Sequence, residues 1–172
     1  MHKIIFLDID GVLNHQLFYE EKTQAERYKE VGHPDCDLDD KAIDLINDLV
    51  KDTGAEIVIS STWRKGKSIE FLQELLDKHG LKAKIIGKTP VYWFGSECEA
   101  NGSVSRGEEI AGWMKKYVDE KKIGWSDLSY VILDDDSDML YRQRNRFLII
   151  DGYCGITYNI VYKAKRILNN EI

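Results

Sequence analysis

Short apolar runs alternate with amphipathic segments along most of this chain. The apolar runs have the length and the residue types of strands that are buried on both faces. They cover residues 3–8, 56–60, 82–86, 130–133 and 147–150. The amphipathic segments carry apolar residues every three or four positions and predict helices over residues 39–52, 67–79, 106–121 and 158–169. This alternation predicts an α/β fold with a parallel sheet.

The remaining segments are expected to connect these elements. Asp37 is a candidate N-cap for the helix over residues 39–52. We interpret residues 14–36 as a short helical or irregular insertion and residues 88–105 as a long loop, because neither has a sustained hydrophobic period. Since no internal repeat or linker divides the chain, we expect a single domain that spans residues 1–172.

The first predicted strand ends in two aspartates that one residue separates. Asp8 and Asp10 precede Gly11, which allows a sharp turn of the backbone. In open α/β sheets the chemistry gathers in the crevice at the carboxyl ends of the strands, so both carboxylates are expected there. A cation between them would keep both ionised. The alternative is an ordinary acidic turn, since Asp-Gly is a common turn sequence.

Polar residues also end the second and the fourth predicted strands. They are Ser60, Ser61 and Thr62 after the second strand, and Asp134, Asp135 and Asp136 after the fourth. If these strands neighbour the first, several carboxylates share one crevice and repel each other unless a cation is bound. Carboxylate ligands without cysteine favour Mg²⁺. A calcium-binding loop over residues 134–138 is a weaker alternative, because the glycine and the terminal glutamate of that pattern are missing.

Residues 8–13, Asp-Ile-Asp-Gly-Val-Leu, resemble motif I of the haloacid dehalogenase (HAD) superfamily. In that family the first aspartate is a nucleophile and the second a general acid/base, which implies these roles for Asp8 and Asp10. The resemblance also implies a three-layer Rossmann-like sheet with strand order 5-4-1-2-3. Because residues 14–36 and 88–105 are short for the cap insertions of the family, it implies a small or absent cap, with residues 14–36 as the candidate.

The other three HAD motifs have counterparts in the expected order, and the four together span residues 3–138. The candidates are Ser60 for motif II, with Ser61 or Thr62 as alternatives, Arg106 for motif III, with Lys88 as a weaker candidate, and Asp134 with Asp135 for motif IV. The resemblance implies phosphoryl binding by Ser60, Ser61 and Arg106. It implies Mg²⁺ binding by Asp8, Asp10, Asp134 and Asp135.

The implied reaction is the hydrolysis of a phosphate monoester. Asp8 would attack phosphorus to form an aspartyl-phosphate, and Asp10 would protonate the leaving alkoxide and then activate water. The strings Ser-Ser-Thr-Trp-Arg at 60–64 and Ile-Leu-Asp-Asp-Asp-Ser-Asp at 132–138 resemble small HAD domains of phage, bacterial and RNA-repair proteins. The acidic pair also resembles that of polynucleotide 3′-phosphatases, which implies a nucleic-acid end as substrate. A small phosphorylated metabolite or a nucleotide is the alternative.

Several other side chains have a structural as well as a chemical interpretation. Trp63 is expected to pack, whereas Arg64 either packs or meets a substrate phosphate. The aromatic run at residues 92–94 either forms a small core of its own loop or stacks on a base. Asp136 and Asp138 are expected to cap a following helix rather than to bind metal.

Composition and charge narrow the class of protein. The chain is 43% hydrophobic and 31% charged, and no apolar run is long enough to span a membrane. The N-terminus lacks a cleavage site, and Cys36, Cys98 and Cys154 have neither metal-binding nor disulfide spacing. We therefore expect a cytoplasmic protein with reduced thiols. The net charge of −6 disfavours broad, nonspecific nucleic-acid binding but allows a local basic groove.

Two other function classes fit parts of the pattern. A binding or toxin-like module could keep the fold without turnover, but the complete set of motif residues disfavours it. A phosphate-sensing receiver domain also uses an acidic crevice with Mg²⁺. The Asp-x-Asp spacing and Arg106 disfavour this alternative, because a receiver retains its phosphoryl group instead of hydrolysing it.

Overall fold

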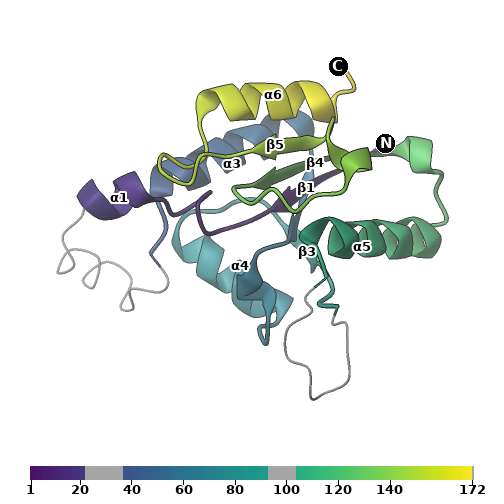
Figure 1. The fold of residues 1–172 in the computed structure, drawn as a ribbon, viewed down its shortest axis with the longest axis horizontal. Coiled ribbons are helices and arrows are strands. Elements are labelled where there is room, and N and C mark those ends of the chain that lie inside the picture. The colour runs from purple at the N-terminus through teal and green to yellow at the C-terminus, as the bar shows by residue number, and fades with distance from the viewer. Residues whose placement is uncertain (22–36, 93–103, 172) are drawn as a thin grey trace.

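The computed structural model describes residues 1–21, 37–92 and 104–171. Within these residues, five strands form one parallel sheet (Figure 1). They are β1 (His2–Leu7), β2 (Glu56–Ile59), β3 (Ile85–Lys88), β4 (Leu128–Asp134) and β5 (Phe147–Ile149). The order across the sheet is β3-β2-β1-β4-β5, which is the predicted order 5-4-1-2-3 read from the opposite edge. The predicted Rossmann-like α/β sheet is therefore confirmed.

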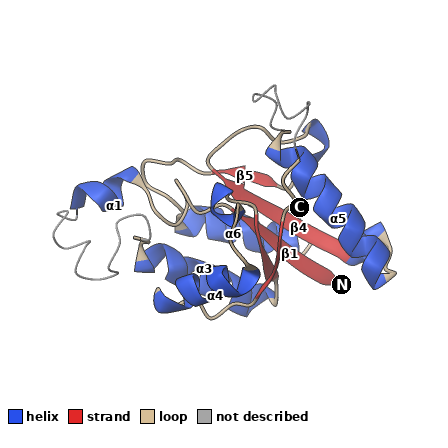
Figure 2. Cartoon of the chain, turned by 90° about the horizontal axis from the view of Figure 1, so that it is seen from below, coloured by secondary structure: helices blue, strands red, loops and turns tan. Residues whose placement is uncertain are grey.

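Helices cover both faces of this sheet. The described α-helices are α1 (Gln16–Glu21), α3 (Asp40–Thr53), α4 (Ile69–Lys78), α5 (Arg106–Lys121) and α6 (Tyr158–Leu168). Helices α3, α4 and α6 share an apolar cluster on one face, and α5 packs on the other (Figure 2). The three expected layers of helix, sheet and helix are thus present.

Strand β1 lies in the middle of the sheet, and its side chains alternate between two apolar clusters. Ile5 and Leu7 face α3, α4 and α6, whereas Ile4 and Phe6 face α5. All four side chains are fully buried, as expected for a strand that is covered on both faces. Burial of each contributes about 1.5–3 kcal/mol, and it fixes the point at which β1 ends and Asp8 follows.

Several predicted element ends shift by one or two residues, and a strand start and a helix cap differ for reasons that the structure shows. β3 begins at Ile85 and not at residue 82, because the Lys82 N–H bonds to the Asn47 side chain of α3 (2.8 Å) instead of a neighbouring strand. Asp39, and not Asp37, caps α3, since its carboxylate accepts a backbone N–H from the first turn (2.9 Å).

Both segments without a predicted period fall largely outside the described residues. Helix α1 is the described part of the expected insertion over residues 14–36. The aromatic run 92–94 is described only at Tyr92, and Cys36 and Cys98 lie outside the described part of the chain. Cys154 is a free thiol.

Among the described helices, none combines the length and the apolar character that crossing a membrane requires.

Candidate active site

The carboxyl ends of β1, β2 and β4 meet at one edge of the sheet. Beyond β1, the Asp8 N–H donates to the Leu133 carbonyl of β4 (3.0 Å), and the Ser60 N–H donates to the Leu7 carbonyl of β1 (2.9 Å). The residue after each strand is therefore held by the neighbouring strand. This brings Asp8, Ser60 and Asp134 to the same edge, as the sequence predicts.

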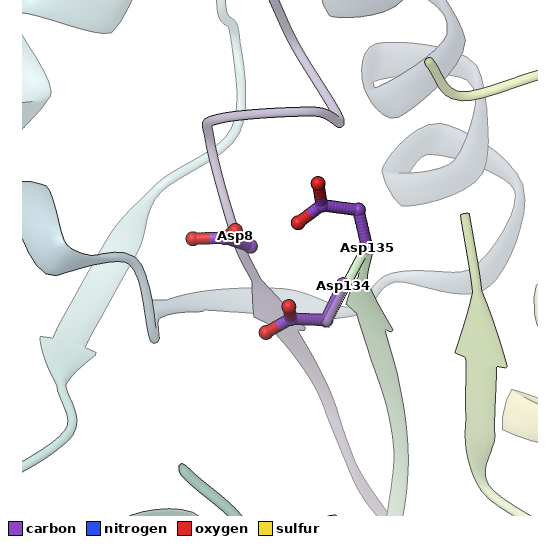
Figure 3. A group of neighbouring side chains, drawn as sticks. All are labelled: Asp8, Asp134 and Asp135. Carbon is purple, nitrogen blue, oxygen red and sulfur yellow. The ribbon is translucent and has the colours of Figure 1, made fainter. Parts of the chain in front are cut away.

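Three carboxylates lie together in this crevice, those of Asp8, Asp134 and Asp135 (Figure 3). One oxygen of each lies within 4.8 Å of the other two. Asp8 and Asp134 are buried, with 4% and 0% of their surface exposed, whereas Asp135 is exposed. Three carboxylate oxygens from two adjacent strands form a ligand set that suits a hard divalent cation.

Two glycines leave room for the Asp135 side chain. A Cβ atom on Gly11 would lie 2.1 Å from Asp135 Oδ2, and one on Gly152 would lie 2.9 Å from the same oxygen. Gly11 also has a φ angle of 71°, which glycine adopts without steric cost. Gly11 therefore leaves room for the Asp135 carboxylate and also allows the turn after β1.

Burial and crowding change the protonation of these carboxyls. Burial and the neighbouring Asp8 carboxylate raise the pKa of Asp134 to about 7, although the charge of Arg106 opposes this. Burial likewise raises the pKa of Asp8 and of Asp135. Asp134 Oδ2 is buried and accepts no hydrogen bond from the described residues, with Arg106 Nη1 at 3.3 Å. A divalent cation would relieve the repulsion and give this oxygen a ligand bond, so the residues fit Mg²⁺.

Arg106 begins α5 and reaches into the crevice from the other side. Its Nη1 atom donates to Asp8 Oδ1 and to the Ser60 carbonyl, both at 2.9 Å. Burial disfavours the charge of this guanidinium, but the carboxylates of Asp8 and Asp134 outweigh that effect and raise the pKa of Arg106. The motif III candidate is thus in contact with the nucleophile candidate.

The first turn of α5 is fixed from two sides. The Ser105 hydroxyl accepts a backbone N–H of this turn (3.3 Å), and the Asp138 carboxylate accepts the Arg106 N–H (2.8 Å). The prediction that Asp136 and Asp138 cap a following helix is therefore wrong. The next helical element is only the 3-10 helix η4 (Tyr141–Gln143), and Asp138 holds the start of α5 instead.

The two serines after β2 have different surroundings. Ser60 Oγ is buried and has no hydrogen-bond partner among the described residues. The Ser61 hydroxyl accepts the Trp63 N–H (3.3 Å), and its interaction with the Asp8 carboxylate opposes the rise in the pKa of Asp8. Ser61 therefore brings its hydroxyl to Asp8, whereas Ser60 contributes its carbonyl to Arg106.

Asp10 is exposed and lies outside the three-carboxylate group. Its Oδ1 accepts from Asn14 Nδ2 (2.9 Å), and its Oδ2 accepts from Trp63 Nε1 (2.8 Å). Asn14 is fixed in turn, because its Oδ1 accepts the Gly11 N–H (3.1 Å). These partners suit the predicted acid/base role of Asp10, and its contact with Mg²⁺ stays a prediction.

Arg64 is buried, and protein acceptors surround its guanidinium. It donates to the carbonyls of Ser60, Ser61, Thr89 and Pro90 and to the Glu109 carboxylate. Of its two interpretations, these contacts support packing, because they engage the donors of the guanidinium. Arg64 joins the ends of β2 and β3 to α5.

Lys88 binds the backbone of the segment that follows β2. Its Nζ donates to the backbone carbonyls of Arg64 and Lys67. Between the two motif III candidates, Arg106 is therefore the one that contacts Asp8.

Sequence reasoning missed Asn14 and Glu109 and underrated Trp63. Asn14 directly follows the motif I string, and a polar residue there was the available signal. Glu109 lies three residues after Arg106 and so on the buried face of α5, where a lone carboxylate needs a cation. Hydrophobic periodicity could not predict the orientation of the Trp63 side chain, because the conformation of a single turn determines that orientation.

An open pocket of about 510 Å³ lies beside Asp10. Asp10, Gly11, Asn14 and Asp135 form the side next to the crevice, and Tyr19 of α1 lies on its lining as well. A ligand in this pocket would have the carboxylates of Asp10 and Asp135 within its walls.

One family model matches most of the chain. The model for the HAD domain in Swiss Army Knife RNA repair proteins matches residues 4–161. That range includes all the candidate residues of the four motifs, from Asp8 to Asp135. No curated protein and no solved structure matches the chain.

Proposed function

The chain belongs to the HAD domains found in Swiss Army Knife RNA repair proteins, and from this premise we propose that it is a Mg²⁺-dependent phosphomonoester hydrolase that acts on nucleic-acid ends. The observation that carries the proposal is the contact of a buried aspartate, Asp8, with Arg106 beside a second buried aspartate, Asp134. Burying two carboxylates against one arginine is costly. A site for a dianionic substrate and a metal accounts for that cost.

Asp8 is proposed as the nucleophile. It attacks phosphorus, and the bond from phosphorus to the leaving oxygen breaks as the aspartyl-phosphate forms. Arg106 holds Asp8 in place and offers its remaining N–H groups to the phosphoryl oxygens, where they stabilise charge in the transition state. Ser61, whose hydroxyl is next to Asp8, and Ser60 are proposed as further phosphoryl ligands.

Asp8, Asp134 and Asp135 would hold Mg²⁺, with Asp10 as a further candidate ligand. When bound, the ion neutralises the charge between these carboxylates and the phosphate and aligns the reacting groups. The buried Asp134 oxygen without a hydrogen bond supports this assignment.

Asp10 is proposed as the general acid and base. Its carboxyl first protonates the leaving alkoxide and then takes a proton from the water that attacks the aspartyl-phosphate. Its exposure and its position on the wall of the open pocket support this role, because both leaving group and water must enter there.

A nucleic-acid end is the proposed substrate class. The family found in RNA repair proteins supports it, and so does an open pocket beside Asp10, which admits a bulky leaving group. A small or absent cap, with residues 14–36 as the candidate, belongs to the same proposal. A small phosphorylated metabolite or a nucleotide is the alternative substrate, and a silent binding module is the alternative class.

The test is phosphate release in Mg²⁺ from p-nitrophenyl phosphate, a panel of nucleotides and a 3′-phosphorylated oligonucleotide. Asp8→Asn is the inactive variant, and Asp44→Asn, on the exposed face of α3, is the matched control. We expect turnover by the wild type and the control, with the highest kcat/KM on the oligonucleotide. Preference for small substrates would reject the nucleic-acid proposal. Wild-type turnover that survives Asp8→Asn would reject the mechanism.

A further inference from the structure

Trp63 is a half-buried indole beside the proposed active site and lies outside the residues of the four motifs. It sits in the 3-10 helix η2 (Thr62–Arg64), which follows β2. Its ring packs against the apolar cluster of α3, α4 and α6, and Lys67 Nζ lies 5.1 Å from the ring centroid. Its backbone N–H bonds to the Ser61 hydroxyl (3.3 Å). These contacts fix the direction in which the indole N–H points.

That N–H donates to Asp10 Oδ2 at 2.8 Å, while Asn14 donates to Oδ1 at 2.9 Å. One neutral donor on each oxygen fixes the rotation of an exposed carboxyl that would otherwise turn freely. A carboxylate has about four lone-pair sites. Two lone-pair sites therefore stay open, and either can carry the proton that passes to the leaving oxygen or comes from water.

We propose that Trp63 is a positioning residue for general acid/base catalysis: its indole N–H holds the Asp10 carboxyl where it exchanges a proton with the leaving oxygen and with water. This inference rests on the proposed phosphatase function. It explains why an indole occupies a turn at the edge of the crevice, where packing alone would be served by any apolar ring.

The two half-reactions need Asp10 differently. In the first, an Asp8 oxygen bonds to phosphorus, the bond from phosphorus to the leaving oxygen breaks, and the Asp10 proton passes to that oxygen. In the second, water attacks phosphorus, its proton passes to Asp10, and the bond from Asp8 to phosphorus breaks. A p-nitrophenolate leaves without a proton, whereas the sugar alkoxide of a nucleic-acid end needs one. The first half-reaction therefore depends on Asp10 only for the alkoxide.

Trp63→Phe removes the N–H and keeps an aromatic ring for packing. On a 3′-phosphorylated oligonucleotide we expect kcat/KM to fall about 10- to 100-fold, because proton transfer to the alkoxide is impaired. On p-nitrophenyl phosphate, kcat/KM reports only attack by Asp8, and we expect it to change less than about threefold. For Trp63→Phe with p-nitrophenyl phosphate, kcat and KM should fall together, because hydrolysis of the aspartyl-phosphate becomes slow. Equal losses of kcat/KM on both substrates would overturn the proposal, since damage to the fold acts on both.

Trp125→Phe is the matched control, because Trp125 is exposed and lies in η3 (Trp125–Asp127), at the other end of β4. We expect unchanged kinetics on both substrates. A second measurement does not depend on turnover. The chain has four tryptophans, and the two variants assign the indole N–H signals of Trp63 and Trp125 in a ¹⁵N spectrum.

Asp10→Ala should shift the Trp63 signal and speed its hydrogen exchange, and it should leave the Trp125 signal in place. An unmoved Trp63 signal would overturn the contact on which the proposal stands. If the signal moves but the wild type hydrolyses none of the substrates, the proposed function fails, and the hydrogen bond is then structural only.

Discussion

We expect the ionised Asp134 carboxylate to lower the stability of the folded, metal-free protein at neutral pH. Its pKa is raised from 3.8 to about 7, first by burial and then by the Asp8 carboxylate. Because the folded protein binds this proton more tightly than the unfolded chain does, stability falls as the pH rises from about 4 to about 7. The difference of roughly three pKa units corresponds to at most about 4 kcal/mol. Below pH 4 the group is protonated in both states and the effect disappears.

Asp134→Asn tests this reasoning, because the amide has the shape of the protonated acid and carries no charge at any pH. In EDTA at pH 8 we expect the variant to be more stable than the wild type by about 2–4 kcal/mol. For a domain of this size, that raises Tm by about 5–15 °C. At pH 4 the two proteins should melt within about 2 °C of each other.

The assay is differential scanning calorimetry in EDTA and in Mg²⁺ at both pH values, with Asp44→Asn as control. Saturating Mg²⁺ at pH 8 should stabilise the wild type by about 2–3 kcal/mol and the Asp134→Asn variant far less. An Asn variant that melts at or below the wild-type temperature in EDTA at pH 8 would refute the claim that Asp134 is an unfavourable buried charge there.

Three further predictions concern Arg64, Gly11 and the two motif III candidates, Arg106 and Lys88. Arg64→Ala leaves the Glu109 carboxylate buried without its cation and should cost about 3–5 kcal/mol in a denaturant titration. As the control, Lys84→Ala at an exposed position should change stability by less than about 0.5 kcal/mol. Gly11→Ala drives a Cβ into Asp135 Oδ2 and should weaken Mg²⁺ binding about 10- to 100-fold by calorimetry; unchanged affinity would remove Asp135 from the metal site. Arg106→Met should lower kcat/KM about 10²- to 10³-fold, and Lys88→Met should lower it far less, since Lys88 Nζ donates to the backbone carbonyls of Arg64 and Lys67. The reverse order of losses would exchange their roles.

The sheet and the crevice were predictable because strong local signals coincide with them. β1 is apolar on both faces, and Asp8 follows where the apolar run stops, so the sequence marks the end of the strand. Ser105 and Arg106 begin an amphipathic helix with a good cap, and the predicted limits 106–121 are those of α5. The spatial order of the strands came from the family resemblance, since periodicity carries no information on which strands are neighbours.

The directions of side chains that follow a strand could not be predicted in the same way. Arg64 and Trp63 are adjacent in one short turn, yet the buried Arg64 side chain donates to the carbonyls of Ser60 and Ser61, whereas the Trp63 indole donates to Asp10. Asp138 was expected to cap the next helix along the chain and instead holds α5, which precedes it by some thirty residues. In each case a partner distant in sequence decides the outcome.

The central claim is that Asp8 forms a covalent bond to the substrate phosphoryl group. The most direct measurement is a rapid acid quench of the protein with a ³²P-labelled phosphomonoester in Mg²⁺, followed by peptide mapping. We predict a hydroxylamine-sensitive label on the peptide that contains Asp8, more of it in Asp10→Asn when p-nitrophenyl phosphate is the substrate, and none in Asp8→Asn. Turnover without any protein-bound phosphate, or a label on a different residue, would contradict the account.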